Sequence, residues 1–309
     1  MQMSNPRRVP LSVVVTVKNE RDAIAALLHD LVEQSAWPAE IVIVDGRSDD
    51  DTIAVVREAQ EDLPVRVLEC EGNIARGRNV GVSAAVSECI VVTDAGCRLS
   101  RDWLEGFHEE FSRGAKVVQG TWRAVGASPF ERGQMSVLYP EGGRGASARS
   151  LGFTKTTWAL VGGFPEELAA AEDSLFVKRL ATIATVGTVK AGVAEWRVRP
   201  GVQPLFRQVR AYAQWDIISG QSVVGRLKIP VAYAATAVAL WVVPLLGVPG
   251  LAVLLARPLL RGWRQRVPFR LWGWVLVAGW TVDAGGVAGA SLGVFLRWRG
   301  MAKGTANIG

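Results

Sequence analysis

The feature that most constrains this chain is a series of four short apolar runs in its first hundred residues. The runs are LSVVVTV (11–17), EIVIVD (40–45), VRVLEC (65–70) and ECIVVTD (88–94). They are rich in β-branched residues, and the stretches between them carry apolar residues at helical spacing. Apolar strands that alternate with helices are typical of a parallel sheet covered on both faces. The first part of the chain is therefore predicted to be α/β, with a Rossmann-like, mostly parallel sheet flanked by helices.

Acidic residues follow three of these runs, near the point where each predicted strand ends. Glu20 comes shortly after the first run, Asp45 ends the second, and Asp94 ends the fourth. In open parallel sheets ligands bind at the carboxyl ends of strands, so these carboxylates are expected to face one crevice. There they can accept hydrogen bonds from a ribose hydroxyl or a base N–H. For Glu20 and Asp45 alone, an ordinary turn rich in Asp, Gly and Ser explains the pattern about as well.

The segment NIARGRNVG (73–81) is predicted to open a helix. Arg76 and Arg78, together with the backbone amides at the helix start, would form a clamp for a diphosphate. The alternative is a solvated basic face. Asp94 could then bind a divalent cation that bridges the phosphates.

The middle of the chain is mixed. AKVVQGTW (115–122) is predicted to be a further strand, and the glycine-rich EGGRGAS (141–147) a mobile loop. AAAEDSLFVKRL (169–180) has a helical pattern with its acids near the start, where the helix dipole favours them. The three cysteines form no C-x-x-C pair, which argues against both a disulfide framework and a zinc site.

Taken together, the motifs VTVKNE, IVDGRSDDDT, ARGRNVG and TDAG, followed by GGF and then ED, resemble a family 2 glycosyltransferase of the GT-A fold. The resemblance covers about residues 10–220. It implies an inverting enzyme that takes a sugar from a nucleotide-diphosphate sugar, with a UDP-sugar as the expected donor. The residues that it assigns to the nucleoside are Thr16, Glu20 and Asp45. Arg76 would lie near the diphosphate, and Asp94 corresponds to the first acid of the family's metal-binding Asp-x-Asp motif.

The sequence departs from the family pattern at Gly96, which stands where many members carry the second acid. Metal binding would then depend on Asp94, diphosphate oxygens and water, a ligand set that suits Mg²⁺ or Mn²⁺. Alternatively, Arg76 and Arg78 carry more of the charge of the leaving group.

The resemblance also implies a catalytic pair, Glu172 and Asp173, downstream of the turn 162–164. Asp173 is expected to be the base that deprotonates the acceptor hydroxyl, with Glu172 beside it as an acceptor contact. Direct displacement at the anomeric carbon needs a strengthened nucleophile on one face while the diphosphate leaves from the other, which inverts the configuration. The structural alternative is that both acids only cap a helix.

A hydroxyl of a lipid or lipid-linked molecule is the expected acceptor. A phosphate acceptor is already anionic and needs no base, so the Glu-Asp pair favours a hydroxyl, but a polyprenyl-phosphate glycosyltransferase stays open. FRQVRAYAQWD (206–216) does not match the Gln-x-x-Arg-Trp motif of processive members, so transfer of a single sugar is expected. Two further alternatives are an inactive sugar-nucleotide-binding scaffold, of which Gly96 would be the trace, and a nucleotidyltransferase, which the first loop VKNERD disfavours.

From residue 230 the composition changes to that of a membrane segment. Residues 230–256 and 271–296 are each long enough to span a bilayer. This end carries eight bases and one acid, Asp283, a charge of +7, so that the first 229 residues carry −1 and the whole chain +6. Basicity confined to a hydrophobic end indicates a membrane and not nucleic acid. The expected organisation is a catalytic domain at 1–222 and membrane-associated helices at 223–309.

The expected location is the cell membrane, with the catalytic domain on the cytoplasmic side, because nucleotide sugars are cytosolic and no signal peptide is recognised. Two full spans would then place the arginine-rich loop RPLLRGWRQRVPFR outside, against the positive-inside tendency. One resolution is a re-entrant hairpin broken at Pro244 and Pro249. The other is a pair of interfacial helices anchored by Trp263, Trp272 and Trp274. An ionisable residue such as Asp283 is either a functional group or a helix-packing group there.

Overall fold

The computed structural model describes residues 7–139, 147–242 and 244–300. The chain divides into two compact units. In the described part, the first unit contains residues 7–123 and 147–196, and the second contains the remainder. The loop expected at 141–147 lies, apart from Ser147, outside the described residues.

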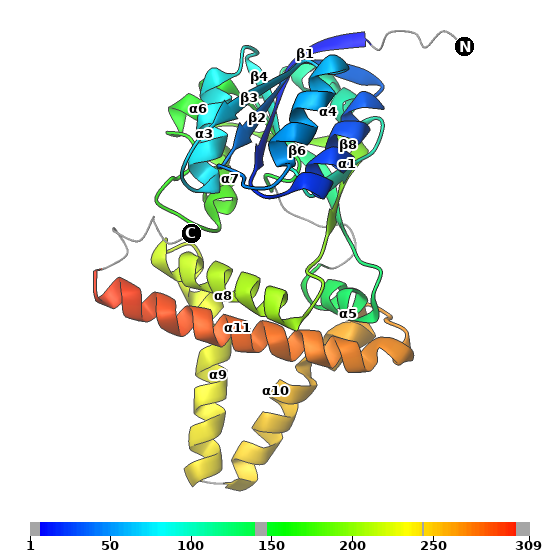
Figure 1. The fold of residues 1–309 in the computed structure, drawn as a ribbon. Coiled ribbons are helices and arrows are strands. Elements are labelled where there is room, and N and C mark those ends of the chain that lie inside the picture. The colour runs from blue at the N-terminus through cyan, green and yellow to red at the C-terminus, as the bar shows by residue number, and fades with distance from the viewer. Residues whose placement is uncertain (1–6, 140–146, 243, 301–309) are drawn as a thin grey trace. The chain divides into compact units, whose positions relative to one another are not determined.

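The first unit is built on an eight-stranded sheet with helices on both faces (Figure 1). Its strands are β1 (Arg7–Val17), β2 (Ala36–Asp45), β3 (Val65–Glu69), β4 (Cys89–Asp94), β5 (Cys97–Leu99), β6 (Val117–Val125), β7 (Leu151–Thr154) and β8 (Val186–Arg197). Its helices are α1 (Arg21–Val32), α2 (Thr52–Glu58), the 3₁₀ turn η1 (Ala59–Glu61), α3 (Ile74–Ala84), α4 (Trp103–Ser112), α6 (Lys155–Leu160) and α7 (Glu172–Ala181). The four predicted strands, the strand expected at 115–122 and the helix expected at 169–180 are all confirmed.

The strand order is β3-β2-β1-β4-β7-β6-β8-β5. β3, β2, β1 and β4 are parallel to one another, whereas β7 pairs antiparallel with β4 and β6, and β5 pairs antiparallel with β8. The α/β class is confirmed, but the sheet is mixed and not mostly parallel. The regular alternation of strands and helices that predicts parallel pairing ends after β4, and the strands beyond it join antiparallel.

The register of β1 explains why polar residues gather at one edge of the sheet. Thr16 is opposite Val44 on one side and Asp94 on the other, and Val17 is opposite Asp45. The carboxyl ends of β1, β2 and β4 therefore meet, as predicted. Helix α3 approaches this edge closely, since a Cβ at Gly77 would lie 3.0 Å from Thr16 Cγ2.

In its described part, the second unit is helical apart from the last residues of β6 and β8. Its helices are α5 (Pro129–Leu138), α8 (Val202–Ile218), α9 (Val223–Val242), α10 (Pro244–Arg264), the 3₁₀ turn η2 (Phe269–Leu271) and α11 (Trp272–Trp298). α5 and α8 share an apolar core with α11, so the division between the units differs from the boundary expected after residue 222.

The apolar segment expected at 230–256 is divided between two helices, with the break next to Pro244, one of the two prolines named for the hairpin alternative. α9 ends at Val242 and α10 begins at Pro244, because proline lacks an N–H and suits the first position of a helix better than its interior. The two helices fold back on each other as a hairpin, since a Cβ at Gly250 would lie 3.3 Å from Thr236 Oγ1 (Figure 1). The segment expected at 271–296 is confirmed as α11.

Candidate functional site

An open pocket of about 310 Å³ lies at the carboxyl edge of β1 and β2. Thr16 and Glu20, both predicted to bind the nucleoside, line it. Asp45 does not, although its neighbours Val44 and Gly46 do. The other residues that line it, none of which the sequence pattern had singled out for binding, are Val17, Lys18, Cys70, Gly72, Asn73, Ile74 and Gly77. The pocket is thus placed where the strand ends predict it, with the start of α3 as a further wall.

Asp45 shapes one wall of this pocket. Its side chain is buried, and its carboxylate accepts hydrogen bonds from Ser48 N at 3.1 Å and from Ser48 Oγ at 2.6 Å. Asn19, which has a left-handed backbone with φ of 54°, accepts a hydrogen bond from Asp49 N at 2.9 Å. The loops after β1 and β2 are therefore locked together by side chain to backbone hydrogen bonds.

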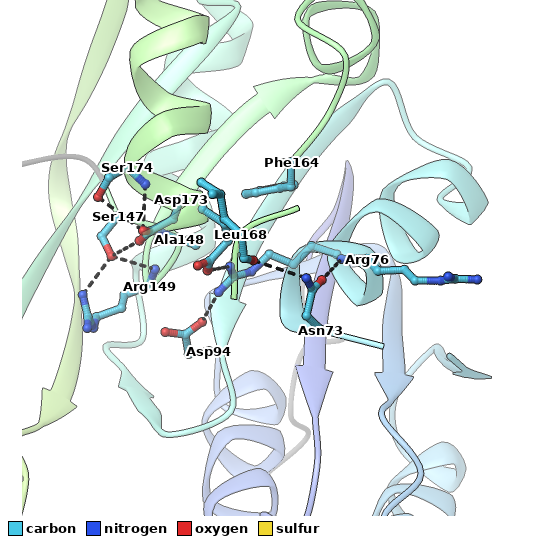
Figure 2. A network of polar contacts seen from close by, with 12 residues as sticks. Asn73, Arg76, Asp94, Ser147, Ala148, Arg149, Phe164, Leu168, Asp173 and Ser174 are labelled. Carbon is cyan, nitrogen blue, oxygen red and sulfur yellow. Dashed lines mark hydrogen bonds and ion pairs between the residues drawn. The ribbon is translucent and has the colours of Figure 1, made fainter. Parts of the chain in front are cut away.

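The start of α3 is fixed by Asn73. Its Oδ1 accepts from Arg76 N at 3.0 Å, which caps the helix, and its Nδ2 donates to the carbonyl oxygen of Leu168 at 3.2 Å. Arg76 is exposed, and Figure 2 shows its side chain extending away from Asp94. This cap has a sequence signal, an Asn directly before the helical segment, but its bond to Leu168 has none.

Arg78 is the most buried charged group at this edge, with 3% of its surface exposed. It donates from Nη2 to Asp94 Oδ1 at 2.7 Å and from Nη1 to Glu172 Oε1 at 2.6 Å. Burial alone would lower the pKa of Arg78, but Asp94, Glu172 and Asp173 outweigh that effect and raise it. The guanidinium therefore stays charged. Arg78, predicted to face the diphosphate together with Arg76, joins the end of β4 to the start of α7.

The two acids of the predicted catalytic pair have different surroundings. Glu172 is buried, and burial raises its pKa while the ion pair with Arg78 opposes that shift. Asp173 is partly exposed, and its Oδ2 accepts from Ser147 Oγ at 3.1 Å and from Ala148 N at 3.3 Å (Figure 2). The first turn of α7 thus aims one acid at Arg78 and the other at residues 147–148.

The backbone that delivers these acids is held in an unfavourable conformation. Ala171, directly before α7, has φ of 63° and is buried. A left-handed conformation at a non-glycine residue costs about 1–2 kcal/mol, so the surrounding packing must hold it. Later in the same helix, Phe176 stacks on Phe164, with ring centroids 3.9 Å apart.

The glycine turn before α7 is tied to α3. Gly162 and Gly163 have φ of 79° and 73°, which only glycine adopts readily. Asn79 then holds the next residue, accepting from Phe164 N and donating to its carbonyl oxygen, both at 2.8 Å. Asn79 had not been singled out, because nothing in its sequence position indicates a partner 85 residues away.

Arg149 is a further residue that the sequence did not reveal. Its guanidinium carbon lies 5.0 Å from the ring centroid of Trp122 and 4.2 Å from that of Trp196. Its Nη1 donates to Ser147 Oγ at 2.9 Å, and Ser147 is the residue that donates to Asp173. A cation held by two tryptophans therefore supports the segment that contacts the predicted base.

Few side chains at this edge could act as metal ligands. Asp94 keeps 29% of its side chain exposed, with one oxygen bound by Arg78. In the described residues no group of three or more His, Cys, Asp and Glu side chains could hold a metal ion. Burial raises the pKa of Cys97 to about 12, so this nearby thiol is protonated and not a ligand. The residues present fit a divalent ion that arrives with a diphosphate, which would supply most of the oxygen ligands.

The comparisons with known proteins agree on a family. Residues 12–161 match the domain described as Glycosyl transferase family 2. A dolichyl-phosphate hexose transferase of Haloferax volcanii is 33% identical over 126 residues, which are 40% of this chain and 52% of that protein. The matched segments span 31–52% of the length of the curated relatives.

Two solved structures share the fold. The mannosyltransferase PcManGT from Pyrobaculum calidifontis, in complex with GDP-Man and Mn²⁺, has a TM-score of 0.64 and 20% identity, covering 94% of this chain and 89% of that one. TarS 1–349 of S. aureus, in complex with UDP-GlcNAc, has a TM-score of 0.50 and 17% identity, covering 94% and 92%. The chain therefore contains a Glycosyl transferase family 2 domain within residues 12–161, on a fold shared with these two glycosyltransferases.

Proposed function

We propose that the protein is an inverting glycosyltransferase that moves one sugar from a nucleotide-diphosphate sugar to a hydroxyl of a lipid or lipid-linked acceptor. The observation that carries this proposal is the Arg78 cluster. One buried cation joins Asp94, at the edge where the pocket lies, to the helix that carries Asp173. Donor and acceptor chemistry would therefore be aligned by a single side chain.

The pocket at the ends of β1 and β2 would hold the nucleoside. Its volume of about 310 Å³ is in the range of small-molecule sites. Thr16, Lys18 and Glu20 would supply polar contacts, and Asp45 would support the wall by fixing the loop after β2. A UDP-sugar is the proposed donor, and the solved relatives are bound to GDP-Man and UDP-GlcNAc.

The diphosphate would lie between this pocket and Asp94. A Mg²⁺ or Mn²⁺ ion bound there would stabilise the negative charge of the leaving group. Asp94 would offer the oxygen that Arg78 does not occupy, and Arg78 would hold the carboxylate in position. Arg76, which is exposed at the start of α3, could move toward the diphosphate when the donor binds.

Asp173 would take the proton of the acceptor hydroxyl. Its two oxygens accept hydrogen bonds from Ser147, Ala148 and Ser174, which fix the carboxylate while lone pairs remain for the acceptor. Glu172 would not reach the acceptor from its buried position. Its role would be to hold the first turn of α7 through Arg78.

A lipid phosphate is the second candidate acceptor, and the 33% sequence identity to a dolichyl-phosphate hexose transferase over 126 residues favours it. The two candidates differ in their need for a base. A hydroxyl acceptor requires Asp173, whereas an anionic phosphate does not.

The hairpin of α9 and α10 would attach the protein to a membrane. α9 is long and apolar enough to span a bilayer, and no residue of its most apolar window is buried. A helix of 20 residues is about 30 Å long, the thickness of the hydrocarbon core. Because α10 returns, the arginine-rich segment 261–270 would lie on the same side as Arg226 and Lys228. This arrangement satisfies the positive-inside tendency that two separate spans violate.

α11 is the other helix with the length and hydropathy of a span, but 44% of its most apolar window is buried. It lies along α8, since a Cβ at Gly293 would be 2.8 Å from the carbonyl oxygen of Gln214. If α11 crossed the bilayer, α8 would have to enter it with the exposed Arg207 and Arg210. We therefore assign α11 and α8 to the interface, on the cytoplasmic side.

The test of this proposal is calorimetric titration of the detergent-solubilised protein with UDP, GDP and dTDP, with and without Mn²⁺. One diphosphate is expected to bind, more tightly with the metal. Asp94→Asn should remove the metal dependence, and Asp22→Asn, at an exposed acid on α1, should change nothing. Failure of all three diphosphates to bind would contradict a nucleotide-sugar donor.

A further inference from the structure

The turn from Ser147 to Ser150 is anchored to the sheet of the first unit through its second half. Ser150 is buried, and its N–H donates to the carbonyl oxygen of Ser147 at 3.0 Å, which closes the turn. The carbonyl oxygen of Arg149 accepts from Thr93 Oγ1 at 2.8 Å. Thr93 lies in β4, directly before Asp94. The 147–150 turn is therefore fixed to the strand that carries the candidate metal ligand.

The first half of this turn contacts Asp173. Ser147 Oγ and Ala148 N both donate to Asp173 Oδ2, at 3.1 and 3.3 Å (Figure 2). Ser147 Oγ also accepts from Arg149 Nη1 at 2.9 Å. A guanidinium can only donate, and a hydroxyl has a single proton. Because Arg149 binds the acceptor side of the hydroxyl, the proton of Ser147 is directed to the Asp173 carboxylate.

Arg149 is itself held by two aromatic rings. Its guanidinium carbon lies over Trp122 of β6 and over Trp196 of β8, and both tryptophans are buried. A guanidinium stacks on aromatic faces, and each such contact contributes about 0.5–2 kcal/mol. Glutamine has neither the charge nor the planar fork of donors, so it would hold Ser147 less firmly.

We propose that Arg149 is a positioning residue for sugar transfer, which holds the Ser147 hydroxyl as a donor to Asp173 and so fixes the carboxylate that takes the proton of the acceptor. This inference rests on the proposed function, in which Asp173 is the base. Arg78 does not duplicate the task, because it binds the other acid of the pair, Glu172. A small displacement of a reacting group can cost about 10²-fold in rate, so a loosened carboxylate is expected to lower kcat.

The test is a double-mutant cycle on the full chain in detergent, with the nucleotide sugar that binds in titration and membrane lipids as acceptor. Arg149→Gln and Ser147→Ala are each expected to lower kcat about tenfold, with KM and the affinity for the nucleotide unchanged. The double variant should be no slower than the slower single variant, because Arg149 acts through Ser147. Losses that multiply to about a hundredfold would overturn the inference. A raised KM for the acceptor with unchanged kcat would also overturn it, since Arg149 would then be an acceptor ligand.

A matched control separates this role from the loss of a charge. Arg123→Gln, at an exposed arginine next to Trp122 on β6, removes the same charge and should leave kcat unchanged. Equal losses for Arg123→Gln and Arg149→Gln would show a general effect of charge and contradict the positioning role. If circular dichroism shows that Arg149→Gln does not fold, Ser147→Ala tests the contact with the base, and unchanged kcat in that variant would refute the inference.

A second cycle distinguishes failure of this inference from failure of the proposed function. Arg149→Gln should have no further effect on kcat in an Asp173→Asn background, because the carboxylate that it positions is already gone. A further tenfold loss there would mean that Arg149 acts on another group. If Asp173→Asn lowers kcat and Arg149→Gln does not, the positioning role fails and the base is retained. If Asp173→Asn changes nothing, the proposed base itself fails.

Discussion

Each unit of this molecule contains a buried cluster of one arginine and acidic partners, and the two clusters differ in composition and access. In the first unit Arg78 holds two carboxylates, and one of them, Asp94, is still partly exposed. In the second unit Arg257 pairs with Asp283, whose other oxygen accepts from the Tyr233 hydroxyl at 3.1 Å. The first cluster has an excess acid open toward a pocket, whereas the second is neutral and enclosed by helices.

This difference suits the Arg78 cluster to ligand binding and the Arg257 cluster to helix packing. A cluster with one cation and two acids keeps an oxygen available for a ligand, and it lies where parallel strands end. A neutral cluster that joins α9, α10 and α11 satisfies its own charges and fixes how the helices meet. Of the two roles open to Asp283, the contacts favour helix packing.

The largest effect on stability is expected from Arg78→Met. The substitution leaves the buried Glu172 and the partly exposed Asp94 without their cation, and breaking a buried pair such as Arg78–Glu172 costs about 3–5 kcal/mol. Chemical denaturation followed by circular dichroism measures it. Arg76→Met, two residues along the same helix but exposed, should change stability by no more than about 0.5 kcal/mol. Equal effects of the two variants would mean that the Arg78 cluster does not support the fold.

Disrupting the Arg257–Asp283 cluster of the second unit should lower stability without changing the affinity for the nucleotide. Asp283→Asn leaves Arg257 without a counter-charge and should cost about 2–3 kcal/mol, less than a fully buried pair because Arg257 is 21% exposed. Thermal unfolding in detergent and nucleotide titration on the same sample measure the two properties. Loss of nucleotide binding with unchanged stability would reverse the roles assigned to the two clusters.

The contact between α8 and α11 should tolerate an added methyl group at Gly286 but not at Gly289. A Cβ at Gly289 would clash with the carbonyl oxygen of Arg210, whereas a Cβ at Gly286 has no atom within 4 Å. Gly289→Ala should therefore cost about 1–3 kcal/mol by overpacking. Gly286→Ala should be neutral or stabilising, as alanine is the better helix former. Similar melting temperatures for the two variants would contradict the close approach of these helices.

The sequence predicts features that a few consecutive residues determine, but not contacts between residues far apart in the chain. The edge of the sheet at which Thr16, Glu20 and Asp45 lie could be predicted, because a strand end is encoded in a few consecutive residues. The ion pair from Arg78 to Glu172 spans 94 residues, and no local pattern encodes it. Arg76 and Arg78 look equivalent in the sequence, yet the helical rotation across two residues leaves Arg76 exposed and Arg78 buried. Hydropathy gave only the length and polarity of the apolar run 230–256, and the prolines at 244 and 249 were the one local sign that it is divided between two helices.

The smallest expected effect is on metal affinity. A Cβ at Gly96 has open space around it, so Gly96→Asp can place a second acid two residues from Asp94. The added carboxylate should strengthen Mn²⁺ binding in the presence of the nucleotide about tenfold, or about 1.4 kcal/mol. Titration with Mn²⁺ measures the change, and Gly96→Asn serves as a control of nearly equal size without the charge. If both variants bind Mn²⁺ like the wild type, the metal does not lie near Asp94.

The most direct test of the proposed reaction is the turnover of Asp173→Asn. Asparagine keeps the shape and can still accept hydrogen bonds from Ser147 and Ala148, but it cannot take a proton. With the nucleotide sugar that binds in titration and membrane lipids as acceptor, kcat is expected to fall about 10²–10⁴-fold, while the affinity for the nucleotide stays unchanged. Ser174→Ala, at the exposed neighbour on α7, should retain most activity. Unchanged transfer by Asp173→Asn would contradict a base-dependent hydroxyl acceptor and would favour an anionic phosphate in its place.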